Sequence, residues 1–212
     1  EGAYWKLSTT PLIVVPHGVD EYFLDPHENT SRELFLLAVS DIYVQKNFLG
    51  LLRAIIELRR QFPEIRLKIA GRPVDLEYFE VLKRLIAEAD LSSNVEFLGH
   101  VETDELRELY RTCGVFVFPS TVETFGNPLV EAMACGAPIA SSNSAAMPEV
   151  LGDAAEFFDP NDVDDMCATI SGLISDQDQR ERLSAAARDR AARYSWQETK
   201  RQTLEVIMGK TG

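Results

Sequence analysis

Short apolar runs alternate with longer amphipathic stretches along most of the chain, and this alternation restricts the possible folds more than any other feature. Strands that are apolar at nearly every position are typical of parallel sheets covered by helices on both faces. The sequence therefore predicts an α/β fold with a doubly wound, Rossmann-like parallel sheet and right-handed crossovers. The predicted strands are Leu12–Val15, Leu34–Val39, Ile65–Gly71, Asn94–Gly99, Gly114–Ser120, Ala137–Ser142 and Ala154–Pro160.

The stretches between these runs have the apolar spacing of amphipathic helices and carry helix start signals. We expect N-caps at Asp75, Thr103 and Asn127, with Pro128 at the first helical position and Gly136 ending that helix. The predicted helices are Asn47–Phe62, Asp75–Asp90, Thr103–Cys113, Asn127–Cys135, Val163–Ser175, Asp178–Arg193 and Trp196–Met208.

The pattern predicts a single domain over residues 1–212, with C-terminal helices over residues 163–212. Residues 1–10 carry no strong pattern, and we expect them to be a segment from a preceding domain. No stretch has the length of apolar residues that a membrane span needs, and the first ten residues do not have the pattern of a signal peptide.

The composition excludes several classes of function. The 212 residues carry a formal net charge of −13, so a nucleic-acid partner or contact with an anionic membrane is not expected from this domain. The three cysteines, Cys113, Cys135 and Cys167, are odd in number and far apart, which is typical of buried thiols in a reducing compartment such as the cytoplasm. The three histidines are scattered, so the sequence predicts no metal site and no cofactor.

The stretch Pro119–Ala140, "PSTVETFGNPLVEAMACGAPIA", holds the strongest chemical signal. It follows a strand, at the edge of the sheet where open α/β proteins bind ligands. A helix that starts at Asn127 offers free amides and a partial positive charge to a phosphate, and Gly126 lets the backbone approach it. Glu123 and Glu131, on either side, can accept hydrogen bonds from sugar hydroxyls. This arrangement suits a nucleotide-diphosphate sugar.

The segment "ETFGNPLVE" resembles the E-x7-E motif of the retaining glycosyltransferases of the GT-B fold, group 1, family 4. Five other segments resemble motifs of that family in chain order: "VVPHGVD", with His17 at the usual asparagine, "VSDIYVQKN", "IAGRP", "NVEFLGHV" and "AMACGAPIASSNSAAMPEV". The resemblance covers about Pro11 to Asn161. It implies the C-terminal, donor-binding half of a GT-B enzyme.

The resemblance also implies roles for individual residues. Glu123 and Lys46 would be the catalytic residues. Glu123 would contact the transferred sugar, and Lys46 would neutralise the diphosphate and the charge that develops on the leaving group. The implied donor-binding residues are Glu131, Phe125, Gly126, Asn127, Leu129, Gly71, Arg72, Gly99, His100 and Val101, with Glu131 on the ribose and Gly99–Val101 beside the base. The implied reaction transfers a hexose from a UDP-, GDP- or ADP-linked donor, with retention at the anomeric carbon and without a metal.

Two departures from the family pattern stand out. The family usually has an arginine where this chain has Asp41, and Arg72 is the candidate for the replacement charge. The chain also resembles only the second of the two GT-B domains, so the acceptor-binding N-terminal domain is absent from it. We expect the domain alone to bind a nucleotide sugar and not to transfer it efficiently.

Two of three alternatives stay open, and the third lacks its sequence signal. The domain could be a nucleotide-sugar binding module without chemistry, which Asp41 and the absent half favour, or a GT-B nucleotide-sugar epimerase. A nicotinamide-dependent oxidoreductase would need a glycine-rich fingerprint after the first strand, and "VPHGVDEYF" does not supply one.

Overall fold

A computed structural model describes residues 13–24 and 31–209. Within these residues the chain forms one six-stranded sheet in the order β3-β2-β1-β4-β5-β6. Every neighbouring pair of strands is parallel. The strands are β1 (Glu33–Val39), β2 (Leu67–Ala70), β3 (Val95–Gly99), β4 (Cys113–Phe118), β5 (Ile139–Ser142) and β6 (Glu156–Phe158). The predicted α/β class and parallel sheet are confirmed.

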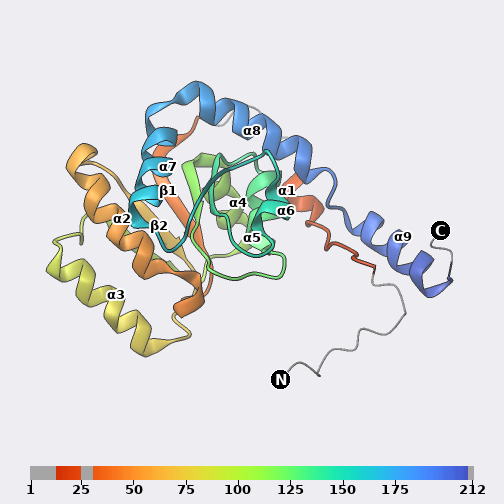
Figure 1. Cartoon of the computed structure of the whole chain (residues 1–212), viewed down its shortest axis with the longest axis horizontal. Helices are drawn as coiled ribbons and strands as arrows, with labels where there is room; N and C mark the ends of the chain where they lie inside the picture. Colours follow the sequence, from red (N-terminus) through yellow and green to blue (C-terminus); the bar gives the residue numbers. More distant parts are fainter. Residues whose placement is uncertain (1–12, 25–30, 210–212) are drawn as a thin grey trace, which may run out of the picture.

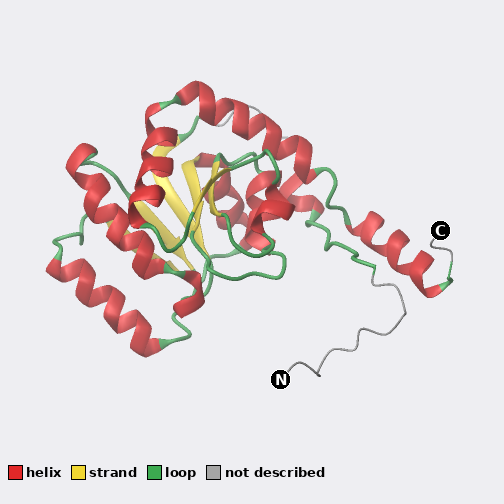
Figure 2. Ribbon diagram, viewed as in Figure 1, coloured by secondary structure: helices red, strands yellow, loops and turns green. Residues whose placement is uncertain are grey.

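Helices cover both faces of the sheet (Figures 1 and 2). On one face, apolar side chains of β1, β2 and β4 pack against α2 (Phe48–Gln61), α3 (Leu76–Glu88) and α7 (Val163–Ser175). On the other face, apolar side chains of β1, β4 and β5 pack against α4 (Thr103–Thr112), α5 (Asn127–Ala134) and α6 (Met147–Leu151). We call the core beside α2, α3 and α7 the first core, and the core beside α4, α5 and α6 the second core. Alternate residues of β1 point to opposite cores, since Leu36 packs in the first core and Leu37 in the second.

The C-terminal helices cross the body and then leave it. In α8 (Gln177–Ala191), Leu183 packs in the first core, whereas Ala187 and Ala191 pack in the second. The following helix, α9 (Trp196–Ile207), has no buried residue and extends away from the sheet on the same side as the first described residues (Figure 1). No helix in the described part of the chain is long and apolar enough to cross a membrane.

Most predicted elements are confirmed, but one strand and two helix caps are not. Residues 13–15 form no strand, and Leu12 lies outside the described residues. The run there is apolar, but its backbone meets the rest of the chain only further on, where Val19 bridges to Ser195. Asp75 caps α3 as predicted, since its side chain accepts from the Tyr78 amide. Thr103 and Asn127 are instead the first residues of their helices.

The actual caps explain these one-residue errors. Glu102, in extended conformation, precedes α4 without a side-chain cap, and Gly126 precedes α5 in the left-handed region with φ 84°. Glycine reaches that region without a steric penalty, which explains why this position holds glycine and not a residue with a polar side chain. The structure also contains elements that no pattern predicted, namely α1 (Glu21–Leu24), the 3-10 helix η1 (Val44–Lys46) and α6.

The three cysteines carry free thiols, as predicted. Cys113 and Cys135 are buried and Cys167 is partly buried. Burial raises the pKa of the Cys113 and Cys135 thiols to about 12 and that of Cys167 to about 11. These thiols therefore behave as small apolar side chains.

The order of the strands in the sheet indicates where the candidate site lies. Chain connections run outward in both directions from the neighbouring strands β1 and β4, so the carboxyl ends of these two strands mark the switch point at which open α/β sheets form a ligand crevice. The loop after β2 belongs to the same edge. Gly71 there has φ 150°, and a Cβ atom on it would lie 1.9 Å from the Ser40 carbonyl oxygen. The loops after β1 and β2 are thus in direct backbone contact.

We expect Gly71→Ala to lower the free energy of unfolding by roughly 2 kcal/mol or more, because alanine adds both a strained φ and a backbone clash. Gly172→Ala is the matched control. Gly172 lies in α7 with open space around its Cβ position, so alanine should stabilise by about 0.5–1 kcal/mol. Urea unfolding of both variants measures the difference, and an unchanged stability of Gly71→Ala would contradict the contact.

Candidate functional site

The loops that follow β1 and β4 are joined at the crevice by hydrogen bonds. The Thr121 amide donates to the Gln45 carbonyl oxygen at 2.9 Å, and the Thr121 hydroxyl donates to the same oxygen at 3.2 Å. This junction brings Lys46, next to Gln45, close to Glu123, two residues after Thr121. The two residues that the sequence proposed as catalytic therefore meet, although 77 positions separate them.

Lys46 and Glu123 form an ion pair between the Lys46 Nζ and the Glu123 Oε1 atoms. Their side chains are only 11% and 14% exposed, so each would be costly to bury without the other. The Lys46 ammonium also lies 5.2 Å from the centre of the Tyr43 ring and 5.9 Å from that of Phe118. Aromatic faces add further attraction for a cation. Lys46 therefore places a largely buried positive charge at the carboxyl ends of β1 and β4, between Glu123 and the two rings.

Local backbone structure explains the position of Lys46. It ends the 3-10 helix η1, and the next residue, Asn47, adopts the left-handed conformation with φ 52°. Asparagine tolerates that conformation. The Asn47 side chain accepts from the Gly50 amide at the start of α2 and donates to the Pro160 carbonyl oxygen at 2.8 Å. A polar residue at this sharp turn therefore positions the lysine before it.

The start of α5 faces solvent. Gly126 is buried, but Asn127 is exposed and Pro128 is only partly buried. A Cβ atom on Gly126 would lie 2.9 Å from the Leu129 Cδ1 atom, so glycine is required by packing as well as by φ. The positive dipole end of this helix is therefore exposed at Asn127, whereas Pro128 has no amide hydrogen and the Leu129 amide donates to the Gly126 carbonyl oxygen.

Glu131 lies one turn inside α5 and accepts a hydrogen bond from the Tyr110 hydroxyl, with 3.0 Å between that oxygen and Glu131 Oε2. Burial raises the pKa of the Glu131 carboxyl, and the Tyr110 hydrogen bond opposes part of that rise. Tyr110 is itself fully buried, and burial raises its pKa well above its ordinary value. The pair gives α5 a carboxylate that is oriented by a fixed donor.

Asp41 is paired with Arg72. Asp41 Oδ1 accepts from the Arg72 backbone amide at 2.9 Å, and Asp41 Oδ2 lies 3.4 Å from Arg72 Nη2. The Arg72 carbonyl oxygen in turn accepts from the Ile42 amide at 2.8 Å. Asp41, at the position where an arginine was expected, thus binds Arg72 from the next loop. The Arg72 side chain is still 67% exposed.

The remaining predicted residues occupy three different environments. The Gly99 carbonyl oxygen accepts from the Gly71 amide at 2.8 Å, which joins the loops after β2 and β3. His100 is exposed, with its Nε2 atom 3.6 Å from Glu102 Oε1, and Val101 packs at the margin of the second core. The Leu129 side chain is fully buried and its amide donates to Gly126, so it supports the start of α5 from inside.

Sequence reasoning missed the groups that hold the site residues in place. Tyr110 and the rings of Tyr43 and Phe118 each contact a predicted residue, and Thr121 bonds to Gln45, which directly precedes Lys46. Phe118 packs in the second core and also lies beside Lys46. A search for polar residues that follow strands would have found Thr121. The pairing of Tyr110 with Glu131 depends on how α4 packs against α5, which no local pattern encodes.

Comparison with known proteins assigns the family. Residues 21–190 match the family described as glycosyl transferases group 1. The chain belongs to this family. The predicted resemblance to the C-terminal domain of a group 1 glycosyltransferase is confirmed. Its fold is that of one Rossmann-like half of a GT-B enzyme.

Relatives of this group 1 domain include mannosyltransferases. The chain is 35% identical over 176 residues to O-antigen chain mannosyltransferase B of Escherichia coli, covering 81% of this chain and 45% of that enzyme. It is 33% identical over 206 residues to the MMP alpha-(1->4)-mannosyltransferase of Mycolicibacterium hassiacum, covering 95% of this chain and 49% of that enzyme. The chain spans about half the length of these curated relatives.

Solved structures share the fold of this group 1 domain. A glycosyltransferase from Rickettsia africae superposes with a TM-score of 0.82 at 20% identity, over 92% of this chain and 56% of that one. The C-terminal domain of the group 1 protein LpcC from Francisella tularensis gives 0.72 at 23% identity, over 82% and 97%. HepE from Anabaena, solved in complex with UDP and glucose, gives 0.77 at 21% identity, over 84% and 49%.

Each partner of the Lys46–Glu123 pair should depend on the other for its burial. We expect Lys46→Met and Glu123→Gln each to lower the free energy of unfolding by roughly 2 kcal/mol, and the double variant to cost less than their sum by about 1–2 kcal/mol. The exposed pair Glu57 and Arg60 in α2 is the control, with an expected coupling below about 0.5 kcal/mol. Additive effects at Lys46 and Glu123 would show that they do not interact.

The raised pKa of Glu131 gives a second prediction. Since the folded-state pKa is above the unfolded one, stability is lost as the pH rises through the folded pKa and the buried carboxyl ionises. Glu131→Gln keeps an acceptor for Tyr110 without the charge. We expect it to be more stable than the wild-type domain at pH 7, with a smaller difference at pH 5, in urea unfolding. A difference that does not depend on pH would refute this, and Glu96→Gln, at an exposed position on β3, is the control.

Proposed function

We propose that this domain binds the donor of a retaining glycosyltransferase, and that the full-length enzyme transfers a hexose from a nucleotide-diphosphate sugar to an acceptor. The observation that carries the proposal is the meeting of Lys46 and Glu123 beside the solvent-facing start of α5. A cation and a helix N-terminus together suit a diphosphate, and a carboxylate beside them suits sugar hydroxyls. HepE, a structural neighbour, was solved with UDP and glucose, which supports a donor of this class.

The proposed arrangement has three parts. The diphosphate would lie at the amides of Gly126 and Asn127 with Lys46 on its phosphates, in place of part of the present contact with Glu123. Glu123 would then face the sugar, and Glu131, oriented by Tyr110, would face the ribose. Gly71, Arg72 and the Gly99–Val101 loop, which share hydrogen bonds along the same edge, would border the base and phosphates.

In the proposed reaction the bond between the anomeric carbon and the diphosphate oxygen breaks, and the acceptor oxygen bonds to that carbon from the same face. The acceptor proton passes to the departing diphosphate, so that the nucleoside diphosphate and the glycoside are the products. Lys46 would stabilise the negative charge that accumulates on the leaving oxygen. The acceptor-binding half would come from the part of the enzyme outside this chain.

Mannose is the first sugar to test, because two relatives that match most of this chain are mannosyltransferases. We also propose a cytoplasmic location, which the free and largely buried thiols support. A binding module without chemistry is the second candidate. Asp41, which places an acid next to Arg72 at this edge, favours it, and turnover of a nucleotide sugar by the full-length protein would exclude it.

Nucleotide binding tests the proposal directly. Titration calorimetry with UDP, GDP and ADP, and with their glucose and mannose conjugates, should identify one nucleotide that binds. We expect Lys46→Ala to weaken that binding about tenfold to hundredfold, since a charge-assisted contact to phosphate is lost. Lys83→Ala, which removes an exposed lysine paired with Glu80 on α3, should leave the affinity unchanged.

Two further variants separate the ends of the ligand. Glu123→Gln should weaken the sugar conjugate more than the nucleotide alone, and Glu131→Gln should weaken both equally. Failure of every nucleotide to bind the wild-type domain, or equal affinity of Lys46→Ala and the wild type, would overturn the proposed site.

A further inference from the structure

Four aromatic residues, His17, Phe125, Tyr194 and Trp196, form a contact that links distant parts of the chain. We call this set the aromatic bridge. The His17 ring stacks on Trp196, with 5.9 Å between the ring centres and 29° between the planes, and lies 5.4 Å from the centre of Phe125. Phe125 meets Tyr194 edge to face at 5.6 Å. The bridge therefore joins the segment before α1, the loop before α5, and the start of α9.

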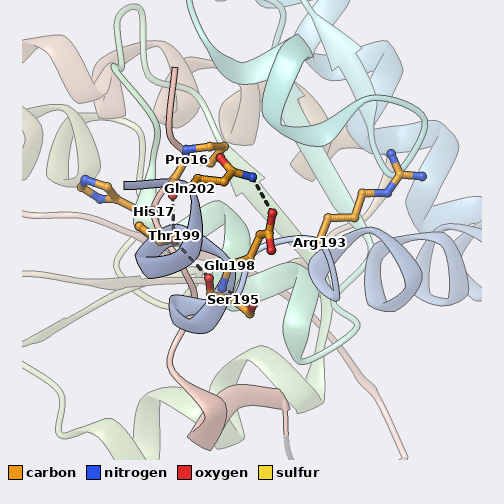
Figure 3. Close-up of a pocket in the computed structure, with 7 residues that line it drawn as sticks. All are labelled: Pro16, His17, Arg193, Ser195, Glu198, Thr199 and Gln202. Carbon is orange, nitrogen blue, oxygen red and sulfur yellow. Dashed lines mark hydrogen bonds between the residues drawn. The ribbon is translucent and has the colours of Figure 1, made fainter. Parts of the chain in front are cut away.

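Backbone contacts fix one side of the aromatic bridge. The Val19 amide donates to the Tyr194 carbonyl oxygen at 2.9 Å, and the Thr199 hydroxyl donates to the Pro16 carbonyl oxygen at 2.8 Å. A Cβ atom on Gly18 would lie 2.2 Å from the Trp196 nitrogen, so these backbones are in close contact. Figure 3 shows Pro16 and His17 beside the first turn of α9, with Ser195 and Thr199.

The other side of the aromatic bridge is the loop of the candidate site. Phe125 is partly buried, stands two residues after Glu123, and directly precedes the left-handed Gly126. Its ring therefore restricts the backbone whose amides open α5. The Tyr194 hydroxyl donates to the Val150 carbonyl oxygen at 2.9 Å, which anchors this second ring to α6.

We propose that His17 is a positioning residue that holds the Glu123–Gly126 loop in its ligand-binding conformation through Phe125. His17 contacts Phe125 from a segment more than one hundred positions earlier in the chain. The His17 ring also stacks on the Trp196 ring, which restricts its movement. Because Trp196 belongs to α9, the same contact transmits any movement of α9 to the loop. This role rests on the proposed function only for its effect on the ligand.

Hydrogen exchange of the loop amides tests the positioning role without any ligand. We expect His17→Ala to accelerate exchange in peptides covering residues 121–127 by about threefold to tenfold, which is the effect of losing one or two ring contacts. His17→Phe keeps an aromatic ring and should restore the wild-type rate. Phe79→Ala is the control, since it removes a ring contact with Phe97 on the edge strand β3, outside the aromatic bridge, so overall stability should fall while loop exchange stays unchanged.

Affinity for the nucleoside diphosphate that binds the wild type provides the functional readout. His17→Ala should weaken it about threefold, and His17→Phe should restore it. Unchanged loop exchange in His17→Ala would overturn the positioning role, and faster exchange with unchanged affinity would overturn its link to the ligand. If the wild-type domain binds no nucleotide, the proposed function fails, whereas the exchange rates still decide whether His17 holds the loop.

Discussion

The parallel pairing of β1 with β4 is the interaction on which the rest of this structure depends. The two strands are distant in sequence, and their pairing at the centre of the sheet reverses the direction of chain progression. Their loops therefore meet at one edge, where Thr121 donates twice to Gln45. Without that junction, Lys46 and Glu123 would be two unpaired charges in separate loops, each too costly to bury alone.

The electrostatic balance of the crevice follows from these pairs. The chain as a whole is strongly acidic, with a net charge of −13, so a phosphate ligand meets an unfavourable background. The ammonium of Lys46, the guanidinium of Arg72 and the positive end of the α5 dipole offset this negative background at the crevice. Both cations are matched to carboxylates, Glu123 and Asp41, which keeps them in place. A ligand that brings its own negative charge would compete with those carboxylates.

Much of the fold could be predicted because its signals are local. Continuous apolar strands such as Val115–Phe118 are buried on both faces, and Asp75 caps α3 as its position suggests. The failures have physical reasons too. The run at residues 13–15 is apolar but finds no strand neighbour among the described residues, and glycine replaces a polar cap at α5. The pairing of Tyr110 with Glu131 depends on helix packing, which sequence spacing does not encode.

A crystal structure of the domain with the nucleoside diphosphate that binds it would show whether the ligand lies at the start of α5. We expect the diphosphate at the amides of Gly126 and Asn127, with the Lys46 ammonium on its oxygens and the ribose hydroxyls on Glu131. A nucleotide bound elsewhere, or a diphosphate at α5 with Lys46 still turned wholly toward Glu123, would contradict it.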